Sequence, residues 1–128
     1  MTSAKKVTIL GSTGTIGMNT LDVIARHPDR YRVFALTANS DTGKIFDQCA
    51  RFKPEYAVMT DSACAQQLQD KLRAQGLNGI SVLSGIEGLE TVAGHPGVDY
   101  VMAAIVGAAG LLPALAAARA GKRVLLAN

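Results

Sequence analysis

The sequence predicts an α/β protein with a doubly wound, mainly parallel sheet and helices on both faces. Six short segments of β-branched and apolar residues alternate with longer segments of helical periodicity along the whole chain. The first expected strand leads straight into a glycine turn, and a helical stretch follows at once. Alternation of this kind is typical of parallel strands joined by right-handed helical crossovers.

The expected elements follow one another without a linker, a repeat or a low-complexity tract. Strands are expected at residues 6–10, 32–38, 56–60, 80–83, 100–105 and 123–126. Apolar residues recur at helical spacing in residues 16–26, 45–52 and 64–72. The chain therefore reads as one compact unit.

Local residues predict where the helices begin and end. Asp41 or Thr42 is expected to cap the second helix, and Asp61 or Ser62 the third. Glycines interrupt residues 84–94, so a short helix is expected there. The last helix, over residues 111–120, has a proline in its first turn and a glycine just past its end.

Composition narrows the class of protein. The chain has 128 residues, 48% of them apolar and 18% charged, which suits one folded domain with a real core. A net charge of +3 suits an anionic ligand, but the cations are scattered and aromatics make up only 5%, so nucleic acid is not an expected partner. No signal peptide or membrane span is expected either, because Gly107, Gly110 and Pro113 break the apolar run over residues 101–118. We expect a soluble, cytoplasmic protein.

The reactive residue types give no catalytic or metal site. Cys49 and Cys64 fall in expected helices without metal-ligand spacing, so free thiols of a reducing compartment are predicted. His27 and His95 each precede a proline and are expected in solvated turns. The sequence indicates no catalytic acid, base or nucleophile and no metal ligand.

The glycine turn is the main candidate site. Gly11, Gly14 and Gly17 come directly after the first strand and open the first helix. Gly11 allows a sharp turn, Gly14 lets a pyrophosphate approach the backbone, and Gly17 lets the helix pack on the sheet. Hydroxyl groups of Ser12, Thr13 and Thr15 and the helix N-terminus add donors. The spacing is G-x-x-G-x-x-G, and the alternative is a tight turn that binds nothing.

Two further segments bear on a dinucleotide. At the end of the second strand, an NAD site would place a carboxylate, but this chain has the amide and hydroxyl of Asn39 and Ser40, and Asp41 follows two residues after Asn39. The amide and hydroxyl groups mildly favour a 2′-phosphate. The alternative is a loop in which Asp41 only caps a helix. The small residues of segment 102–110 would let a flat ring approach the backbone. Close helix–sheet packing explains the same small residues equally well.

Together these segments resemble the N-terminal domain of the 1-deoxy-D-xylulose 5-phosphate reductoisomerase family. The resemblance rests on residues 8–17 and 20–23, on the Val-Met-Ala-Ala-Ile-Val-Gly-Ala-Ala-Gly-Leu-Leu-Pro run at 101–113, and on residues 120–122 leading to 126–128. It implies a Rossmann-like fold and an NADPH-dependent oxidoreductase and isomerase of isoprenoid biosynthesis by the methylerythritol phosphate pathway. Such an enzyme isomerises and reduces its phosphosugar to 2-C-methyl-D-erythritol 4-phosphate, with Mn²⁺, Mg²⁺ or Co²⁺ as Lewis acid.

The resemblance also assigns residues and partners. Thr13, Gly14, Thr15 and Ile16 would contact the pyrophosphate of NADPH, Asn39, Ser40 and Asp41 would lie around the 2′-phosphate, and Asn128 would lie near the reactive end. The family commonly has glycine, a basic residue and asparagine where this chain has Asn39-Ser40-Asp41, so its NADPH preference is less secure here. A homodimer is implied for the full-length enzyme.

The expected domain is residues 1–128 as an NADPH-binding fragment of a longer enzyme. The family's metal-binding acids, substrate loop and C-terminal domain would lie beyond Asn128, so the chain alone is expected to be inactive. Two alternatives stay open at this point. One is the cofactor domain of another NAD(P)-dependent oxidoreductase, such as a semialdehyde dehydrogenase or a dihydrodipicolinate reductase. The other is a free-standing nucleotide-sensing module.

Overall fold

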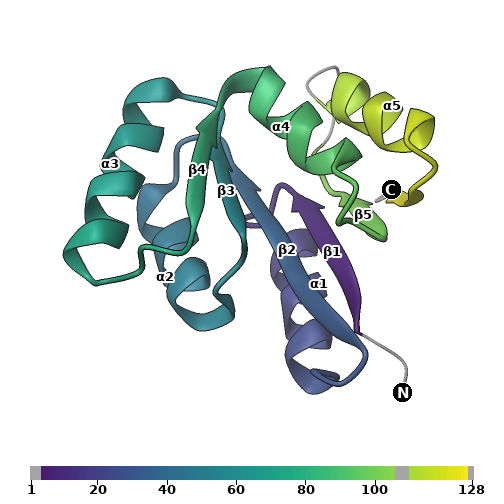
Figure 1. Cartoon of the computed structure of the whole chain (residues 1–128), viewed down its shortest axis with the longest axis horizontal. Helices are drawn as coiled ribbons and strands as arrows, with labels where there is room; N and C mark the ends of the chain where they lie inside the picture. Colours follow the sequence, from purple (N-terminus) through teal and green to yellow (C-terminus); the bar gives the residue numbers. More distant parts are fainter. Residues whose placement is uncertain (1–3, 106–109, 127–128) are drawn as a thin grey trace.

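The computed structural model of the chain describes residues 4–105 and 110–126. Strands and helices alternate throughout these residues (Figure 1). In chain order they are β1 (Lys5–Leu10), α1 (Thr15–Arg26), β2 (Tyr31–Ala38), α2 (Thr42–Phe52), β3 (Tyr56–Met59), α3 (Ser62–Ala74), β4 (Ser81–Ser84), α4 (Gly85–Gly94), β5 (Tyr100–Ala103), α5 (Leu111–Arg119) and β6 (Arg123–Leu126).

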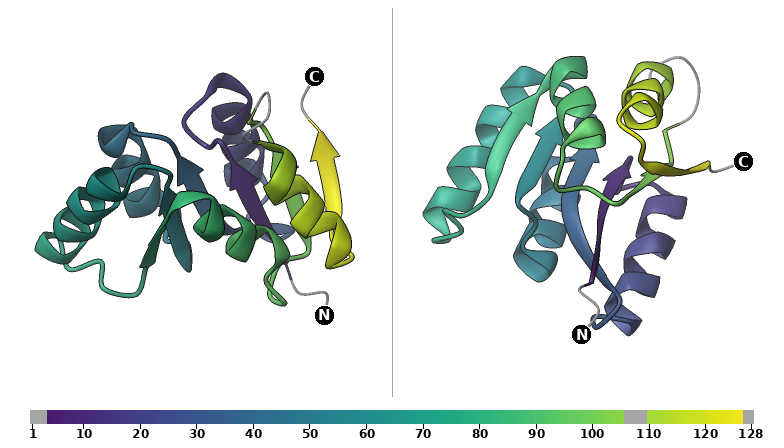
Figure 2. Two further views of the ribbon diagram at one scale, coloured as in Figure 1. Left: turned by 90° about the horizontal axis from the view of Figure 1, so that it is seen from above. Right: turned by 45° about the vertical axis from the view of Figure 1, so that its right-hand side comes forward.

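The strands form one parallel, doubly wound sheet, as predicted. Its order is β4-β3-β2-β1-β5-β6, and all neighbouring strands pair in parallel. The chain thus runs outward from β1 to β4 and then crosses back to β5 on the other side of β1. Helices α1, α2 and α3 cover one face of the sheet, and α4 and α5 cover the other (Figure 2). The direction of winding reverses between β1 and β5, where such folds leave a crevice for ligands.

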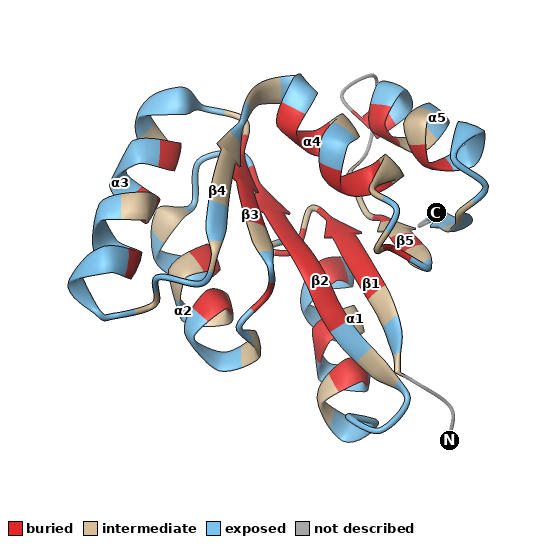
Figure 3. Cartoon of the chain, viewed as in Figure 1, coloured by how far each residue is buried: buried red, intermediate tan, exposed pale blue. Residues whose placement is uncertain are grey.

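The core lies in two layers, one on each face of the sheet. Val7 and Ile9 of β1 belong to the layer under α1, α2 and α3, whereas Leu10 belongs to the layer under α4 and α5. Central strands are buried on both faces, as Figure 3 shows for β1 and β2. Thr8 is fully buried among them, and its hydroxyl donates to the Val92 carbonyl of α4 over 2.8 Å. That hydrogen bond satisfies a polar group that would otherwise be costly to bury.

The helix caps are those the sequence predicted. The Asp41 carboxylate accepts the Lys44 N–H at 3.0 Å and begins α2, and Asp61 accepts the Cys64 N–H at 3.0 Å and begins α3. This backbone hydrogen bond holds the pKa of Asp61 below its ordinary value, because it stabilises the ionised carboxylate. The caps fix where both helices leave the sheet.

Element bounds differ from the expected ones by two residues at most. β3 ends at Met59, although the Thr60 N–H still donates to the Ala38 carbonyl, and β5 ends at Ala103. α4 spans 10 residues in spite of its glycines. A Cβ on Gly88 would lie 2.9 Å from Val58 Cγ1 and 3.0 Å from Leu83 Cβ. This glycine therefore lets α4 approach β3 and β4 instead of interrupting the helix.

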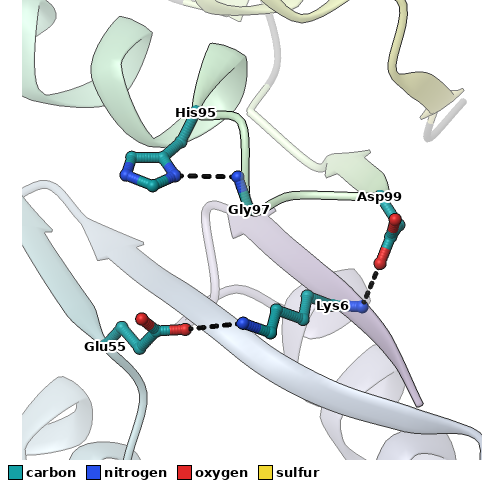
Figure 4. Close-up of polar contacts among 5 residues, drawn as sticks. All are labelled: Lys6, Glu55, His95, Gly97 and Asp99. Atoms are coloured by element: carbon teal, nitrogen blue, oxygen red, sulfur yellow. Dashed lines mark hydrogen bonds and ion pairs between the residues drawn. The ribbon is translucent and has the colours of Figure 1, made fainter. Parts of the chain in front are cut away.

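One histidine prediction is wrong. His27 is exposed, as expected, but His95 is half-buried against Phe34 and Tyr56, with ring centroids 4.8 Å and 5.6 Å away. Its Nδ1 accepts the Gly97 N–H at 2.9 Å (Figure 4). The turn before Pro96 folds the imidazole back onto the aromatic rings, so it is only partly exposed to solvent.

The amino end of the sheet, where His95 lies, carries an ion pair and a hydrogen bond from β1 to the residue just before β5. Figure 4 shows Lys6 Nζ beside Glu55 at 3.3 Å and the Lys6 N–H donating to Asp99 at 2.9 Å. Both contacts lie at the amino ends of the strands, opposite the glycine turn. They connect segments at the amino end of the sheet and do not involve its carboxyl end, where the candidate site lies.

Candidate functional site

The glycine turn is folded tightly on itself after β1. Gly11 has a φ of +86°, a conformation that other L-residues rarely adopt, and a Cβ there would lie 3.2 Å from Ile105 Cγ1. A Cβ on Gly17 would lie 2.6 Å from Ser12 Cα, and 2.8 Å from its carbonyl carbon. Both positions therefore require glycine. Gly17 was expected to allow packing on the sheet, but it packs against the turn itself.

Gly14 is different, because the protein does not need a glycine there. It is the residue before α1, with an ordinary φ of −80°, and the nearest atom to a Cβ would be the Gly11 oxygen at 3.8 Å. The position is exposed. Space is therefore kept open beside the turn, as close approach of a ligand would require.

The start of α1 presents a row of free donors. Within residues 4–105 and 110–126, the backbone N–H groups of Thr13, Gly14, Thr15 and Ile16 donate to no protein acceptor, and the first helical bond runs from Met18 to the Gly14 carbonyl. No carboxylate lies in the first turn of α1. Free N–H groups and the positive end of the helix dipole make such a terminus suitable for an anion.

The turn opens onto a cavity of about 590 Å³ at the carboxyl ends of the strands. Five structural segments contribute to its lining: the turn (Gly11, Thr13, Gly14), the end of β2 (Thr37, Ala38, Asn39), the end of β3 (Thr60), the start of α4 (Gly85, Ile86, Leu89) and the segment after β5 (Ala104, Ile105). The cavity thus reaches from the helix N-terminus to the tip of β2 and across the point where the winding reverses. An elongated ligand with a phosphate in the middle would match this shape.

The segment after β2 was predicted to surround a 2′-phosphate. Asn39, Ser40 and Asp41 are all exposed, and Asn39 lines the cavity. The Thr60 hydroxyl donates to the Asn39 side-chain oxygen, which leaves the amide N–H donors of Asn39 for other partners. The Asp41 carboxylate is engaged as the cap of α2.

Ser12 does not serve as a phosphate donor, contrary to expectation. It is fully buried, and its single hydroxyl hydrogen lies within reach of two acceptors, the Thr37 carbonyl at 3.1 Å and Gln48 Oε1 at 2.7 Å. Its N–H also donates to the Thr37 carbonyl, at 2.8 Å, while the Gly11 N–H donates to Thr37 Oγ1 at 2.8 Å. The hydroxyl therefore builds the turn and is not available to a ligand.

Sequence reasoning missed Thr37, Gln48 and Thr60 as residues of this region. Gln48 could have been found, because it lies three residues after buried Ile45 and next to buried Cys49, on the inward stripe of α2. A glutamine on such a stripe must find partners for its amide. The partners lie 36 residues earlier in the chain, and no local pattern indicates them.

Some predicted features lie outside the described residues. Asn128 and most of the glycine-rich segment after β5, residues 106–109, are among them. Ala104 and Ile105 of the same segment are described and line the cavity, and the Ala104 N–H donates to the Leu10 carbonyl at 2.9 Å.

In the described part of the chain, no three His, Cys, Asp or Glu side chains come together as a metal-binding group. Among the helices described, none is both long enough and apolar enough to cross a membrane.

A doubly wound parallel sheet, with a glycine turn that opens a helix N-terminus onto the crevice, defines a Rossmann-like α/β domain. The similarity of the chain to known proteins agrees with this fold class. The family described as 1-deoxy-D-xylulose 5-phosphate reductoisomerase matches residues 7–128. The protein of that name from Nitrosomonas europaea is 62% identical over 128 residues, which are 100% of this chain and 31% of the relative.

Solved structures show the same likeness. A crystal structure of DOX-P reductoisomerase in complex with NADPH, fosmidomycin and magnesium has a TM-score of 0.92 and 47% identity, covering 97% of this chain and 30% of that one. The reductoisomerase from Zymomonas mobilis in complex with NADPH has a TM-score of 0.89 and 42% identity, covering 98% of this chain and 32% of that one.

The chain belongs to the 1-deoxy-D-xylulose 5-phosphate reductoisomerase family. This confirms the resemblance to that family. The chain spans about a third of the length of the curated relatives it matches. The similarity extends over the turn, the tip of β2 and the segment after β5.

Proposed function

We propose that these 128 residues form the NADPH-binding domain of a 1-deoxy-D-xylulose 5-phosphate reductoisomerase. One observation carries the proposal: the row of N–H groups at the start of α1 that donate to no acceptor among the described residues, beside the open space at Gly14. Family membership, and the NADPH in two structures of relatives, support the same ligand.

The pyrophosphate would lie against the N-terminus of α1. The N–H groups of Thr13, Gly14, Thr15 and Ile16 would donate to its oxygens, and the hydroxyls of Thr13 and Thr15 are within the same turn. A dianionic pyrophosphate gains from the positive end of the helix dipole at this position. A side chain at Gly14 would occupy the space that the ligand needs.

The 2′-phosphate would be held at the tip of β2. The Asn39 amide and the Ser40 hydroxyl supply donors, and Lys44 in the first turn of α2 is the nearest cation in sequence. Asp41 adds a negative charge that disfavours the phosphate, but its carboxylate is turned to the Lys44 N–H. The donors of Asn39 and Ser40 therefore favour NADPH in spite of Asp41.

The nicotinamide end of the cofactor would reach Ala104 and Ile105. The family resemblance would assign Asn128, which lies outside the described residues, to the neighbourhood of the ring. NADPH supplies a hydride when it is bound. The small Ala104 side chain lets a flat ring approach the segment after β5, and the Ile86 and Leu89 side chains make the facing wall apolar and limit water.

The longer enzyme would isomerise 1-deoxy-D-xylulose 5-phosphate and reduce it to 2-C-methyl-D-erythritol 4-phosphate, in the cytoplasm and as a homodimer. Its Mg²⁺, Mn²⁺ or Co²⁺ would be held by acids of the part that this chain does not cover. No catalytic residue is assigned within the 128 residues, so the chain alone is proposed to bind the cofactor without turning over the phosphosugar.

Amide chemical-shift mapping on the ¹⁵N-labelled 128-residue chain tests the site. NADPH should shift the amides of residues 13–16 and 39–41 in wild type, and Gly14→Val should abolish the shifts. Gly79→Val is the matched control, because Gly79 lies outside the cavity lining and its Cβ would meet no atom within 4 Å. Shifts confined to other segments, or shifts that persist in Gly14→Val, would contradict the proposed site.

A further inference from the structure

Gln48 connects α2 to the phosphate-binding turn by two hydrogen bonds. Its Oε1 accepts the Ser12 hydroxyl at 2.7 Å, and its Nε2 donates to the Ser12 carbonyl at 2.9 Å. The amide is thus engaged at both ends by one residue of the turn. Gln48 is half-buried, and the interaction spans 36 residues of sequence.

The second of these bonds determines which way a peptide group faces. The peptide between Ser12 and Thr13 is planar and trans, so its carbonyl and its N–H point in opposite directions. Because Gln48 draws the Ser12 carbonyl toward α2, the Thr13 N–H must point away from α2. Thr13 lines the cavity, and its N–H is the first of the unpaired donors.

The opposite orientation of this peptide would weaken an anion site. A rotated peptide would withdraw the Thr13 N–H and present a carbonyl oxygen, which repels phosphate oxygens. Thr37 does not prevent the rotation, since it holds the N–H groups of Gly11 and Ser12 and the Ser12 hydroxyl, and none of its bonds involves the Ser12 carbonyl. Among the residues described, Gln48 alone donates to that carbonyl.

We propose that Gln48 is a positioning residue for the pyrophosphate of the dinucleotide: it fixes the Ser12–Thr13 peptide so that the Thr13 N–H faces the ligand. The inference rests on the proposed dinucleotide binding. Gln48 also belongs to the helix that begins beside Asn39, Ser40 and Asp41, so one side chain joins the pyrophosphate turn to the element that follows the 2′-phosphate segment.

The first test compares ligands with and without a pyrophosphate. Gln48→Met keeps a chain of similar length but removes both hydrogen bonds, and Gln67→Met, at an exposed position of α3, is the matched control. The Kd of NADP⁺ should rise about tenfold in Gln48→Met, because the variant loses the hydrogen bond that orients the Thr13 N–H toward the charged pyrophosphate. The Kd of adenosine 2′-monophosphate, which has no pyrophosphate, should change less than about twofold. Equal weakening of both ligands, or of neither, overturns the positioning role.

A second variant gives a pH signature that a merely structural role would not produce. In Gln48→Glu the ionised carboxylate cannot donate to the Ser12 carbonyl, whereas the protonated carboxyl can. The ratio of the variant's NADP⁺ Kd to that of wild type should therefore fall toward one as the pH is lowered from 8 to 5. A ratio that does not change with pH contradicts the proposal.

A ligand-free measurement separates this inference from the proposed function. The ¹⁵N order parameter of the Thr13 amide should be lower in Gln48→Met than in wild type and in Gln67→Met. If wild type binds no NADP⁺, the proposed function fails, and the order parameter still decides whether Gln48 orders the peptide. An equally rigid Thr13 amide in Gln48→Met overturns the inference whether or not the ligand binds.

Discussion

Gly14 and Gly17 stand three residues apart in the same turn, yet they have opposite roles. A Cβ on Gly17 would press on Ser12 Cα at 2.6 Å, whereas a Cβ on Gly14 would meet only the Gly11 oxygen at 3.8 Å. The fold thus requires a glycine at position 17, whereas at position 14 it does not, and the space there is open to the proposed ligand. Spacing alone does not distinguish them.

Gly17→Ala is expected to lower the free energy of unfolding by about 1–3 kcal/mol, because the turn backbone must shift to admit the methyl group. Gly14→Ala should cost at most about 1 kcal/mol, the effect of a poorer residue at the start of a helix. Urea unfolding at equilibrium measures both. A Gly17→Ala variant as stable as Gly14→Ala would show that the turn is looser than the structure indicates.

Cys49 gives a pH dependence of stability. Burial raises the pKa of its thiol from 9.0 to about 12, so the unfolded chain loses this proton at a lower pH than the folded chain does. The contribution of the protonated Cys49 thiol to the free energy of unfolding is fully present below pH 9 and is lost as the pH rises toward 12. The free energy of unfolding of wild type should fall, relative to Cys49→Ala, by up to about 1.4 kcal/mol per pH unit above pH 9.

Urea unfolding of both proteins at pH 8.0, 9.5 and 10.5 measures that difference. Cys64→Ala is the control for general alkaline effects, because Cys64 is only half-buried at the start of α3. A difference between wild type and Cys49→Ala that stays constant across these pH values would contradict the raised pKa.

Residue patterns predicted positions better than partners. The thiols are free in the structure, with Cys49 buried and Cys64 half-buried, as expected. Ser12 and His95 were misjudged for the same physical reason: each is held by groups distant in sequence, Gln48 for Ser12 and Phe34 for His95. A hydroxyl in a glycine turn or an imidazole before a proline does not reveal such contacts.

At the scale of elements, the start of α2 combines an observed structural role, the Asp41 cap, with a proposed binding role. Asp41→Ala should destabilise the chain by about 1 kcal/mol through loss of the cap, whereas Asp41→Asn keeps a capping oxygen and should stay within about 0.5 kcal/mol of wild type. Because Asp41→Asn also removes a negative charge beside the proposed 2′-phosphate, it should bind NADPH more tightly than wild type.

Thermal unfolding and NADPH titration of both variants test this pair of effects. Asp70→Asn is the matched control, since it removes the same charge from an exposed position of α3. If Asp41→Asn were as unstable as Asp41→Ala, the carboxylate would have a role other than capping. Unchanged NADPH affinity would place the 2′-phosphate away from Asp41.

The types of the elements were predictable because the spacing of apolar residues in the sequence matches the pattern of buried residues in the structure. β1 and β2 are apolar runs that are buried on both faces, and α2 and α3 carry apolar stripes that begin at a carboxylate cap. The short helix expected within residues 84–94 is present as α4, and close packing on Val58 and Leu83 makes its Gly88 part of the helix–sheet contact. This contact depends on how α4 packs against β3 and β4, so the sequence of α4 alone does not reveal it.

For the whole molecule, the doubly wound topology was predictable from the alternation of strands and helices, and it places the site. The reversal of winding beside β1 brings the glycine turn, the tip of β2 and the segment after β5 to one cavity. What the sequence could not supply is the set of partners that Thr37 and Gln48 find in the turn. Their hydrogen bonds arise from the packing of α2 and β2 around the end of β1.

Calorimetric titration of the 128-residue chain with NADPH and with NADH tests most directly whether the cofactor binds at the N-terminus of α1, with its 2′-phosphate at the tip of β2. We expect NADPH to bind more tightly than NADH, and Gly14→Val to abolish the binding. NADH binding as tight as NADPH, or undiminished binding by Gly14→Val, would contradict it.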